Sequence, residues 1–130
     1  MHIALVMTPD PVTVGPEASL ATVKSLMDAG KFRRVVIVEK GTPIGIVTER
    51  DLREHNGYLE STKVTAAMRS PVITIAPDRT AEDAARLLLA HKIGGLPVVQ
   101  GERLIGIVTS TDLLKAFLRM AAAAEQILRE

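Results

Sequence analysis

The chain has no cysteine and no tryptophan, and it has only one tyrosine and two phenylalanines among its 130 residues. Without cysteine it cannot form disulfides, thiolate zinc sites or a cysteine nucleophile, and this composition is compatible with a reducing cytoplasm. So few aromatic rings cannot stack the successive bases of a nucleic-acid strand. These absences exclude the cysteine-dependent functions and argue against binding of RNA or DNA.

An excess of charge of one sign is also missing, since 16 Lys and Arg side chains are balanced by 15 Asp and Glu side chains. No surface field is therefore expected to hold nucleic-acid phosphates or an anionic membrane. No apolar run reaches the roughly 18 residues of a spanning helix, and residues 1–9 lack the basic segment of a signal peptide. We expect a cytoplasmic protein that binds neither nucleic acid nor membrane.

Motifs for metal binding and catalysis are missing as well. His2, His55 and His91 stand at no metal-ligand spacing, and there is no cysteine to complete a site. The sequence has no Gly-rich phosphate loop, no Gly-x-Ser-x-Gly elbow and no His-Glu-x-x-His helix. We expect no metal, no cofactor and no enzymatic activity.

What is present is an internal duplication. When the sequence is aligned with itself at an offset of 61 residues, positions 7–52 give 14 identities in 46 pairs without a gap. Unrelated sequences of ordinary composition would give about three. Two copies at this spacing predict a first repeat at residues 1–61 and a second at residues 62–130, packed about a pseudo-twofold axis as one compact module.

Each half contains the same order of elements. A short β-rich segment, at residues 12–14 and again at 72–75, follows proline-containing turns. A helix comes next, with Ser19 and Thr80 as N-caps and Gly30 as the stop in the first half. A hairpin of two β-branched runs follows, predicted at residues 35–38 and 44–47 and at residues 96–99 and 105–108. Each half ends in a helix, so the order is β-α-β-β-α and the fold class is α+β.

The last helix is predicted to run long, because no helix breaker occurs between Asp112 and Glu130. Its apolar stripe extends for about 30 Å, beyond any counterpart in the first half. A stripe of this length requires a partner surface, and we expect self-association, with a homodimer as the state.

The longest shared block covers residues 44–52 and recurs at residues 105–113, each with Thr-x-x-Asp at a strand-to-helix junction. One interpretation is a capping box, in which the Thr and Asp side chains satisfy backbone amides at the helix start. The other is a ligand site, in which the carboxylate holds a vicinal diol and the hydroxyl holds phosphate. Both roles are compatible in one residue.

This block, together with the duplication and the strand-helix order, resembles the cystathionine-β-synthase (CBS) domain family across nearly the whole chain. Members of that family pair two β-α-β-β-α repeats and carry a Gly-hydrophobic-hydrophobic-Thr/Ser-x-x-Asp signature, which both copies here satisfy. The resemblance implies a tandem CBS-domain pair, or Bateman module, with two clefts between its repeats. It also implies a non-enzymatic regulatory module that binds AMP, ADP, ATP or S-adenosylmethionine and acts in trans on a partner.

The resemblance also implies roles for single residues. The two aspartates would hold ribose hydroxyls, the threonines would face ribose or phosphate, and Arg50 would add charge. The adenine would lie against residues 32–36 or 93–97 and against the start of a repeat. The implied nucleotide-binding residues are Val6, Phe32, Arg33, Arg34, Thr48, Arg50, Asp51, Ala67, Ile93, Gly94, Pro97, Thr109, Thr111 and Asp112.

The two copies differ just before the second strand of each half, where the pair Arg33 and Arg34 is replaced by a glycine pair at 94–95. We expect each cleft to combine the aspartate of one repeat with the adenine segment of the other. The cleft of Thr109, Thr111 and Asp112 would then contain the two arginines and would bind phosphorylated ligands more tightly. The arginines equally fit a solvated strand edge.

Three functions stay open at this point. The first is a sensor for adenosine nucleotides, and the second is a protein–protein interaction and dimerisation scaffold whose clefts stay empty. The third is a small enzyme that acts on a nucleotide, for which the sequence offers no candidate base together with an activated nucleophile.

Overall fold

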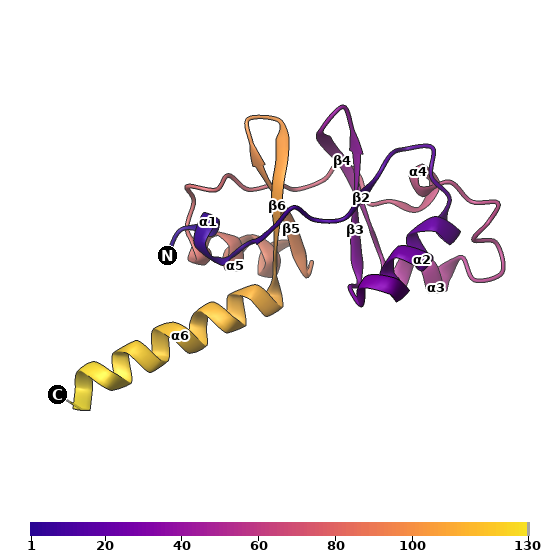
Figure 1. Cartoon of the computed structure of the whole chain (residues 1–130). Coiled ribbons are helices and arrows are strands. Elements are labelled where there is room, and N and C mark those ends of the chain that lie inside the picture. Colours follow the sequence, from indigo (N-terminus) through magenta and orange to yellow (C-terminus); the bar gives the residue numbers. More distant parts are fainter. Residues whose placement is uncertain (130) are drawn as a thin grey trace.

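The computed structural model of the protein describes residues 1–129 and consists of two α+β halves whose three-stranded sheets lie side by side (Figure 1). The first sheet has the order β2 (Thr13–Val14), β3 (Arg34–Glu39), β4 (Thr42–Thr48). The second has the order β1 (Thr8–Pro9), β6 (Arg103–Thr109), β5 (Gly95–Gln100). The larger helices are α2 (Leu20–Gly30), α3 (Glu49–Glu54), α5 (Ala81–His91) and α6 (Ser110–Arg129). The α+β fold of a tandem repeat is thereby confirmed.

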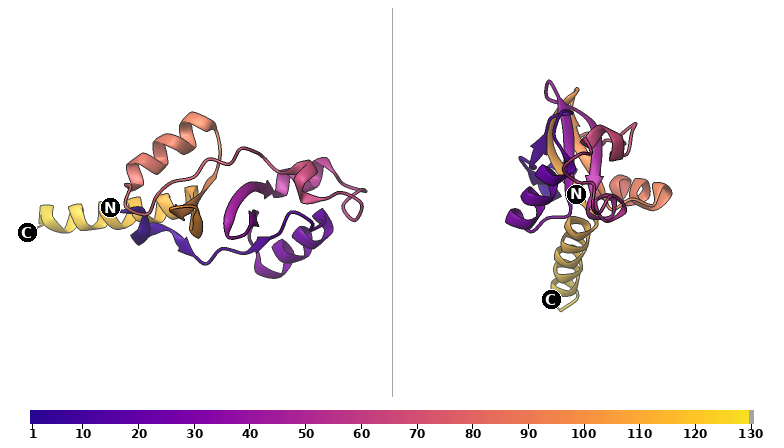
Figure 2. Two further views of the ribbon diagram at one scale, coloured as in Figure 1. Left: turned by 90° about the horizontal axis from the view of Figure 1, so that it is seen from above. Right: turned by 90° about the vertical axis from the view of Figure 1, so that its right-hand side faces the viewer.

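The two halves exchange their first segments. Helix α1 (Ile3–Val6) packs into the core of the second half, and β1 pairs antiparallel with β6. Helix α4 (Val64–Ala67) packs into the core of the first half, and the following Arg69 pairs with Ile46 of β4. In Figure 1 the N-terminal segment passes from α1, beside the second sheet, to β2 in the first. In Figure 2 (left) the two crossing segments run between the halves on opposite sides.

The helix starts follow the predicted caps. The Ser19 hydroxyl accepts a hydrogen bond from the backbone N of Thr22 at 3.2 Å, and Thr80 and Asp83 form a capping box. The predicted stop at Gly30 differs in detail, since the left-handed residue is Lys31, with φ of 56°. Position 30 requires glycine for another reason, because a Cβ there would collide with the ring of Phe32.

The predicted hairpins are present, and the strand expected at residues 72–75 is reduced to one parallel bridge between Ile75 and Val98. The crossing explains the glycine of the shared signature. A Cβ on Gly45 would collide with the sulfur of Met68, and a Cβ on Gly106 would collide with the sulfur of Met7. Only glycine allows the crossing segments to lie this close to β4 and β6.

Helix α6 runs unbroken over 20 residues, as its sequence predicts. It projects away from both sheets (Figures 1 and 2), and Ala116 is its only buried residue within the described chain. No helix within residues 1–129 has both the length and the apolar character that crossing a membrane requires. The large apolar side chains that α6 leaves exposed are Leu114, Phe117, Leu118, Met120, Ile127 and Leu128.

Candidate functional site

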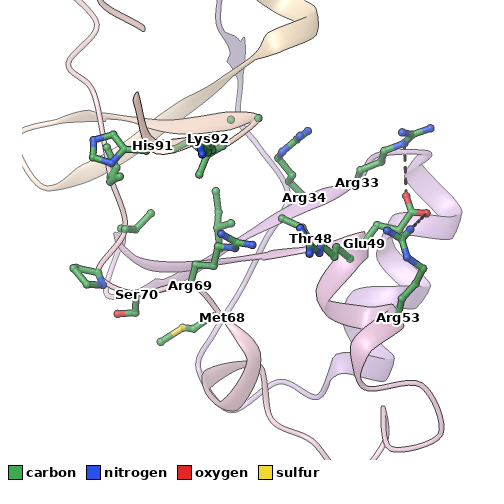
Figure 3. A pocket seen from close by; sticks show the side chains of 18 residues that line it. Arg33, Arg34, Thr48, Glu49, Arg53, Met68, Arg69, Ser70, His91 and Lys92 are labelled. Carbon is green, nitrogen blue, oxygen red and sulfur yellow. Dashed lines mark hydrogen bonds and ion pairs between the residues drawn. The ribbon is translucent and has the colours of Figure 1, made fainter. Parts of the chain in front are cut away.

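A cleft of about 720 Å³ lies between the two halves and is named here the basic cleft (Figure 3). Four segments line it. Arg33 and Arg34 come from the start of β3, and residues between Ile46 and Arg53 come from β4 and α3. The crossing segment that follows α4 contributes residues 68–73, and the end of α5 with the start of β5 contributes residues 91–95. Both halves therefore contribute to one cavity.

The pairing of β3 with β4 positions one wall of this cleft. Arg34 lies opposite Thr48 in the antiparallel ladder, and the backbone N of Glu49 donates to the carbonyl of Arg33 at 3.0 Å. Because β3 begins where β4 ends, the arginine pair and the start of α3 lie side by side.

The opposite wall is shaped by the glycine pair of the second half. A Cβ on Gly94 would collide with a terminal nitrogen of the Arg34 guanidinium, and a Cβ on Gly95 would lie 3.0 Å from the Cδ of Arg34. The Arg34 side chain therefore occupies space that only glycine leaves free. The arginine pair of one repeat and the glycine pair of the other fit together at this point.

The cleft carries a large excess of positive charge. Its only carboxylate among residues 1–129 is that of Glu49. The basic side chains that line it are Arg33, Arg34, Arg50, Arg53, Arg69 and Lys92. Glu49 pairs with Arg33 at 3.6 Å and with Arg53 at 3.3 Å. Arg50 pairs outside the cleft with Glu54 at 3.5 Å.

Three cations of the cleft are not neutralised. Arg34, Arg69 and Lys92 form no ion pair with any carboxylate of residues 1–129. In Figure 3 these three side chains surround the middle of the cleft, whereas Arg33, Glu49 and Arg53 lie together at one end. Burial, together with the neighbouring charge of Arg33, lowers the pKa of Arg34. An anion bound beside Arg34 would stabilise its charged form and so oppose both effects.

An apolar surface adjoins these cations. Ile46, Met68, Val72, Ile73 and Ile93 line the same cleft, and Ile46 is only 8% exposed. A flat apolar ring system can lie on such a surface, while an anionic group attached to it reaches the guanidinium side. The cleft can therefore bind a heterocycle that carries phosphate.

Asp51 caps helix α3 beneath this cleft. Its Oδ2 atom accepts hydrogen bonds from the backbone N of Thr48 at 2.8 Å and from the Thr48 hydroxyl at 3.0 Å. The backbone N of Asp51 donates to that hydroxyl at 3.4 Å, which completes a capping box. Asp51 is 6% exposed and does not line the cleft, whereas Thr48 does. The capping interpretation of the shared block is correct for this copy.

Asp112 has the same bonds and one more. Its Oδ2 atom accepts from the backbone N of Thr109 at 2.9 Å and from the Thr109 hydroxyl at 3.0 Å. Its Oδ1 atom accepts from the hydroxyl of Thr8, in the N-terminal crossing segment that contains β1, at 3.2 Å. Both carboxylate oxygens of Asp112 are therefore already bonded within the protein.

The structure brings together six of the residues that sequence reasoning assigned to nucleotide binding, namely Arg33, Arg34, Thr48, Arg50, Ile93 and Gly94. The arginine pair was expected beside Thr109, Thr111 and Asp112. It lies instead in the cleft of Thr48, because β3 pairs with β4 of its own half.

Other assigned residues lie outside the basic cleft. Val6 and Pro97 are buried, and Ala67 packs against the core of the first half. Phe32 lines a separate groove of about 800 Å³ between α2 and α3. Thr111 is exposed on the first turn of α6.

Sequence reasoning did not assign Arg53, Arg69 and Lys92 to the cleft. Arg53 lies one turn beyond Arg50 on α3, a spacing that was available in the sequence. Lys92 could have been noticed because both repeats place a lysine there, at Lys31 and Lys92, each in the left-handed conformation. Arg69 had no sequence signal, because only the crossing of the halves brings it to β4.

Comparison with known proteins gives a family match over most of the chain. The family model described as CBS domain matches residues 3–57 and again residues 64–119. The uncharacterized protein MJ1404 of Methanocaldococcus jannaschii is 32% identical over 87% of this chain and 31% of that protein. An inosine-5'-monophosphate dehydrogenase of Halobacterium salinarum is 34% identical over 88% of this chain and 23% of the enzyme. The chain thus spans about a third or less of these two relatives.

A third relative is closer in size. The CBS domain-containing protein YhcV of Bacillus subtilis is 32% identical, and the similarity covers 82% of this chain and 79% of YhcV.

Solved structures with the same fold were also found. The AcuB protein of Vibrio cholerae has a TM-score of 0.84 and 31% identity, covering 97% of this chain and 96% of that one. CBSX2 in complex with AMP has a TM-score of 0.83 and 28% identity, with coverages of 92% and 98%. The CBS domain pair of MJ0100, in complex with 5'-methylthioadenosine and S-adenosyl-L-methionine, has a TM-score of 0.82 and 25% identity, with coverages of 90% and 95%.

Proposed function

Because the chain belongs to the CBS domain family, we propose that it is a regulatory module that binds an adenosine nucleotide in the basic cleft. The observation that carries the proposal is the meeting of three unneutralised cations, Arg34, Arg69 and Lys92, with an apolar wall in one cavity. Two structural neighbours support the ligand class, since one is a complex with AMP and the other a complex with S-adenosylmethionine and 5'-methylthioadenosine.

The proposed binding mode follows the chemistry of the walls. The adenine lies against Ile93 and the apolar residues of the crossing segment, and the ribose lies near Thr48. The phosphates lie among the free cations, where guanidinium groups form paired hydrogen bonds with phosphate oxygens. Asp51 holds the Thr48 hydroxyl in place through its Oδ2 atom, and we propose that its Oδ1 atom, reached past Thr48 at the edge of the cleft, meets a ribose hydroxyl.

We propose that the module is not an enzyme and that it acts in trans. Ser70, Thr48 and His91 line the cleft, but within residues 1–129 no hydrogen bond joins a lining hydroxyl to His91 or Glu49 as its base, and the Thr48 hydroxyl donates to Asp51 instead. A regulatory output then requires another surface, for which the exposed apolar stripe of α6 is suited. We propose that a second copy of the chain covers this stripe in a homodimer, and the expected cytoplasmic location stays a prediction.

A thermal-shift panel of AMP, ADP, ATP, NAD and S-adenosylmethionine tests the ligand class. A ligand at a hundred times its dissociation constant adds about 2.7 kcal/mol to the free energy of unfolding and raises the melting temperature by several degrees. A shift with adenosine nucleotides that is lost in Arg34→Ala supports the proposal. No shift with any ligand of the panel would favour the alternative function of an empty interaction scaffold.

A further inference from the structure

We infer that the basic cleft selects adenosine nucleotides with two or three phosphates over AMP and S-adenosylmethionine, and that Gly94 is a positioning residue for this selection because it makes room for the Arg34 guanidinium. The inference rests on the proposed function and narrows its ligand class.

The number and origin of the free cations support more than one phosphate. Arg34 comes from β3, Arg69 from the crossing segment and Lys92 from the turn that precedes β5. They extend into the cleft from three separate places around its middle (Figure 3). A single phosphate can meet one or two of them, so a chain of two or three phosphates neutralises the set more fully.

The same charges disfavour S-adenosylmethionine. Its sulfonium and ammonium groups are positive, and its one carboxylate offsets only one of them. Within the lining of the cleft only Glu49 is acidic, and Glu49 is already paired with Arg33 and Arg53. A cationic ligand would therefore meet repulsion without a free carboxylate to offset it.

Gly94 decides where the charge of Arg34 lies. A methyl group at position 94 would overlap the end of the Arg34 side chain, which is flexible and can move away at small cost. Gly94→Ala should therefore keep the fold and the charge but turn the guanidinium out of its present position. The variant therefore tests the position of the Arg34 charge while the charge itself is retained.

The test is calorimetric titration of ATP, ADP, AMP and S-adenosylmethionine into the full chain and into Gly94→Ala, Arg69→Ala and two control variants. We expect the wild type to bind ATP on the order of tenfold or more tightly than AMP, and a preference that falls as salt is raised. Arg69→Ala and Gly94→Ala should each reduce the ratio of ATP affinity to AMP affinity severalfold.

The controls match each change in chemistry. Gly15→Ala places the same methyl group in open space, and Arg103→Ala removes an exposed cation at the start of β6, outside the cleft. Both should retain the wild-type ratio, and circular dichroism should show that all four variants are folded.

Equal affinity of the wild type for AMP and ATP, or tighter binding of S-adenosylmethionine, overturns the selectivity and leaves the proposed function intact. A Gly94→Ala variant with an unchanged ratio overturns the role of Gly94 alone. Absence of binding by every nucleotide overturns the proposed function and this inference with it.

Discussion

The two halves share one scaffold but carry different surfaces at equivalent positions. In the first half Arg50 and Arg53 face the basic cleft, and the crossing segment adds Arg69. At the offset of 61 residues, their equivalents around the second signature are Thr111, Leu114 and Thr8. The Thr8 hydroxyl donates a hydrogen bond to the Asp112 carboxylate, whereas its equivalent in the first half, Arg69, is a free cation of the basic cleft. The duplication therefore kept the fold of the site and changed its charge.

The exposed faces of α2 and α5 also differ, and here the first half is charged whereas the second half is apolar. In the first half Lys24 and Asp28 form an ion pair at 2.8 Å on α2. Their equivalents on α5 are Ala85 and Leu89, and Leu89 is 79% exposed. Buried positions have to satisfy the same packing in both copies, whereas exposed positions are free to diverge. We interpret the basic cleft between the halves as the ligand side and the outer helices of the second half as the partner side.

The largest expected effect concerns the partner side. Phe117→Asp places a charge in the apolar stripe of α6, where the wild-type ring is 61% exposed and available for burial by a second copy. Burial of one such side chain contributes roughly 1.5 to 3 kcal/mol, so the proposed homodimer should have a dissociation constant one to two orders of magnitude higher in the variant. Light scattering over a concentration series measures the mass.

The matched control lies in the first half. Asn56 is the equivalent of Phe117, and Asn56→Asp should leave the mass unchanged. A wild-type protein that is monomeric at roughly tens of micromolar would end the proposal of a homodimer.

The next effect concerns the repeated lysines. Lys92→Ala should weaken ATP binding roughly tenfold, because it removes one free cation from the basic cleft. Lys31→Ala changes the same left-handed position in the other half, where the side chain lines the groove between α2 and α3, and should leave ATP affinity unchanged. Calorimetric titration compares them, and equal losses in both variants would contradict the assignment of the nucleotide to one cleft.

The two capping aspartates give a smaller contrast. Asp51→Ala and Asp112→Ala should each lower the free energy of unfolding by about 1 kcal/mol through loss of the cap. Only Asp51→Ala should also weaken ATP binding, since Asp51 supports Thr48 in the basic cleft. Urea denaturation and titration of both variants separate the roles. Unchanged affinity in both would leave the aspartates with capping alone.

The smallest effect is a dependence of stability on pH, which we expect for a residue of α5 and not for its equivalent on α2. The hydrogen bond from Arg79, together with those from Thr80, lowers the pKa of Asp83 to about 2 from 3.8. Because the folded pKa is depressed, the stabilisation is present above 3.8 and is lost as the pH falls toward about 2. Asp83→Asn should lower the melting temperature at pH 7, and the difference from wild type should shrink across that window.

The equivalent position on α2 is Thr22, which does not titrate. Thr22→Asn should therefore change stability by the same amount at every pH. A constant difference for Asp83→Asn in thermal melts between pH 7 and pH 2 would contradict the role of its charge.

Much of the fold was predictable from local patterns. The caps at Ser19 and Thr80, the two hairpins and the unbroken α6 depend on residues that lie close together in the sequence. The repeat is visible because these local patterns recur at an offset of 61 residues. Hydrogen bonds at helix ends and the alternation of buried residues along strands act over a few residues, so the sequence expresses them directly.

The composition of the cleft was decided by tertiary structure alone. The resemblance to the CBS family implied roles for Thr48 and Arg34, which both line the cleft, but Arg34 was expected with the other aspartate. The grouping depends on the crossing that brings Arg69 to β4 and on the fit of the Arg34 guanidinium beside Gly94. These contacts join residues far apart in the chain, and they form only when the two halves close around each other. The sequence alone therefore determined the repeat and its elements, while the packing of one half on the other decided which charges share a cavity.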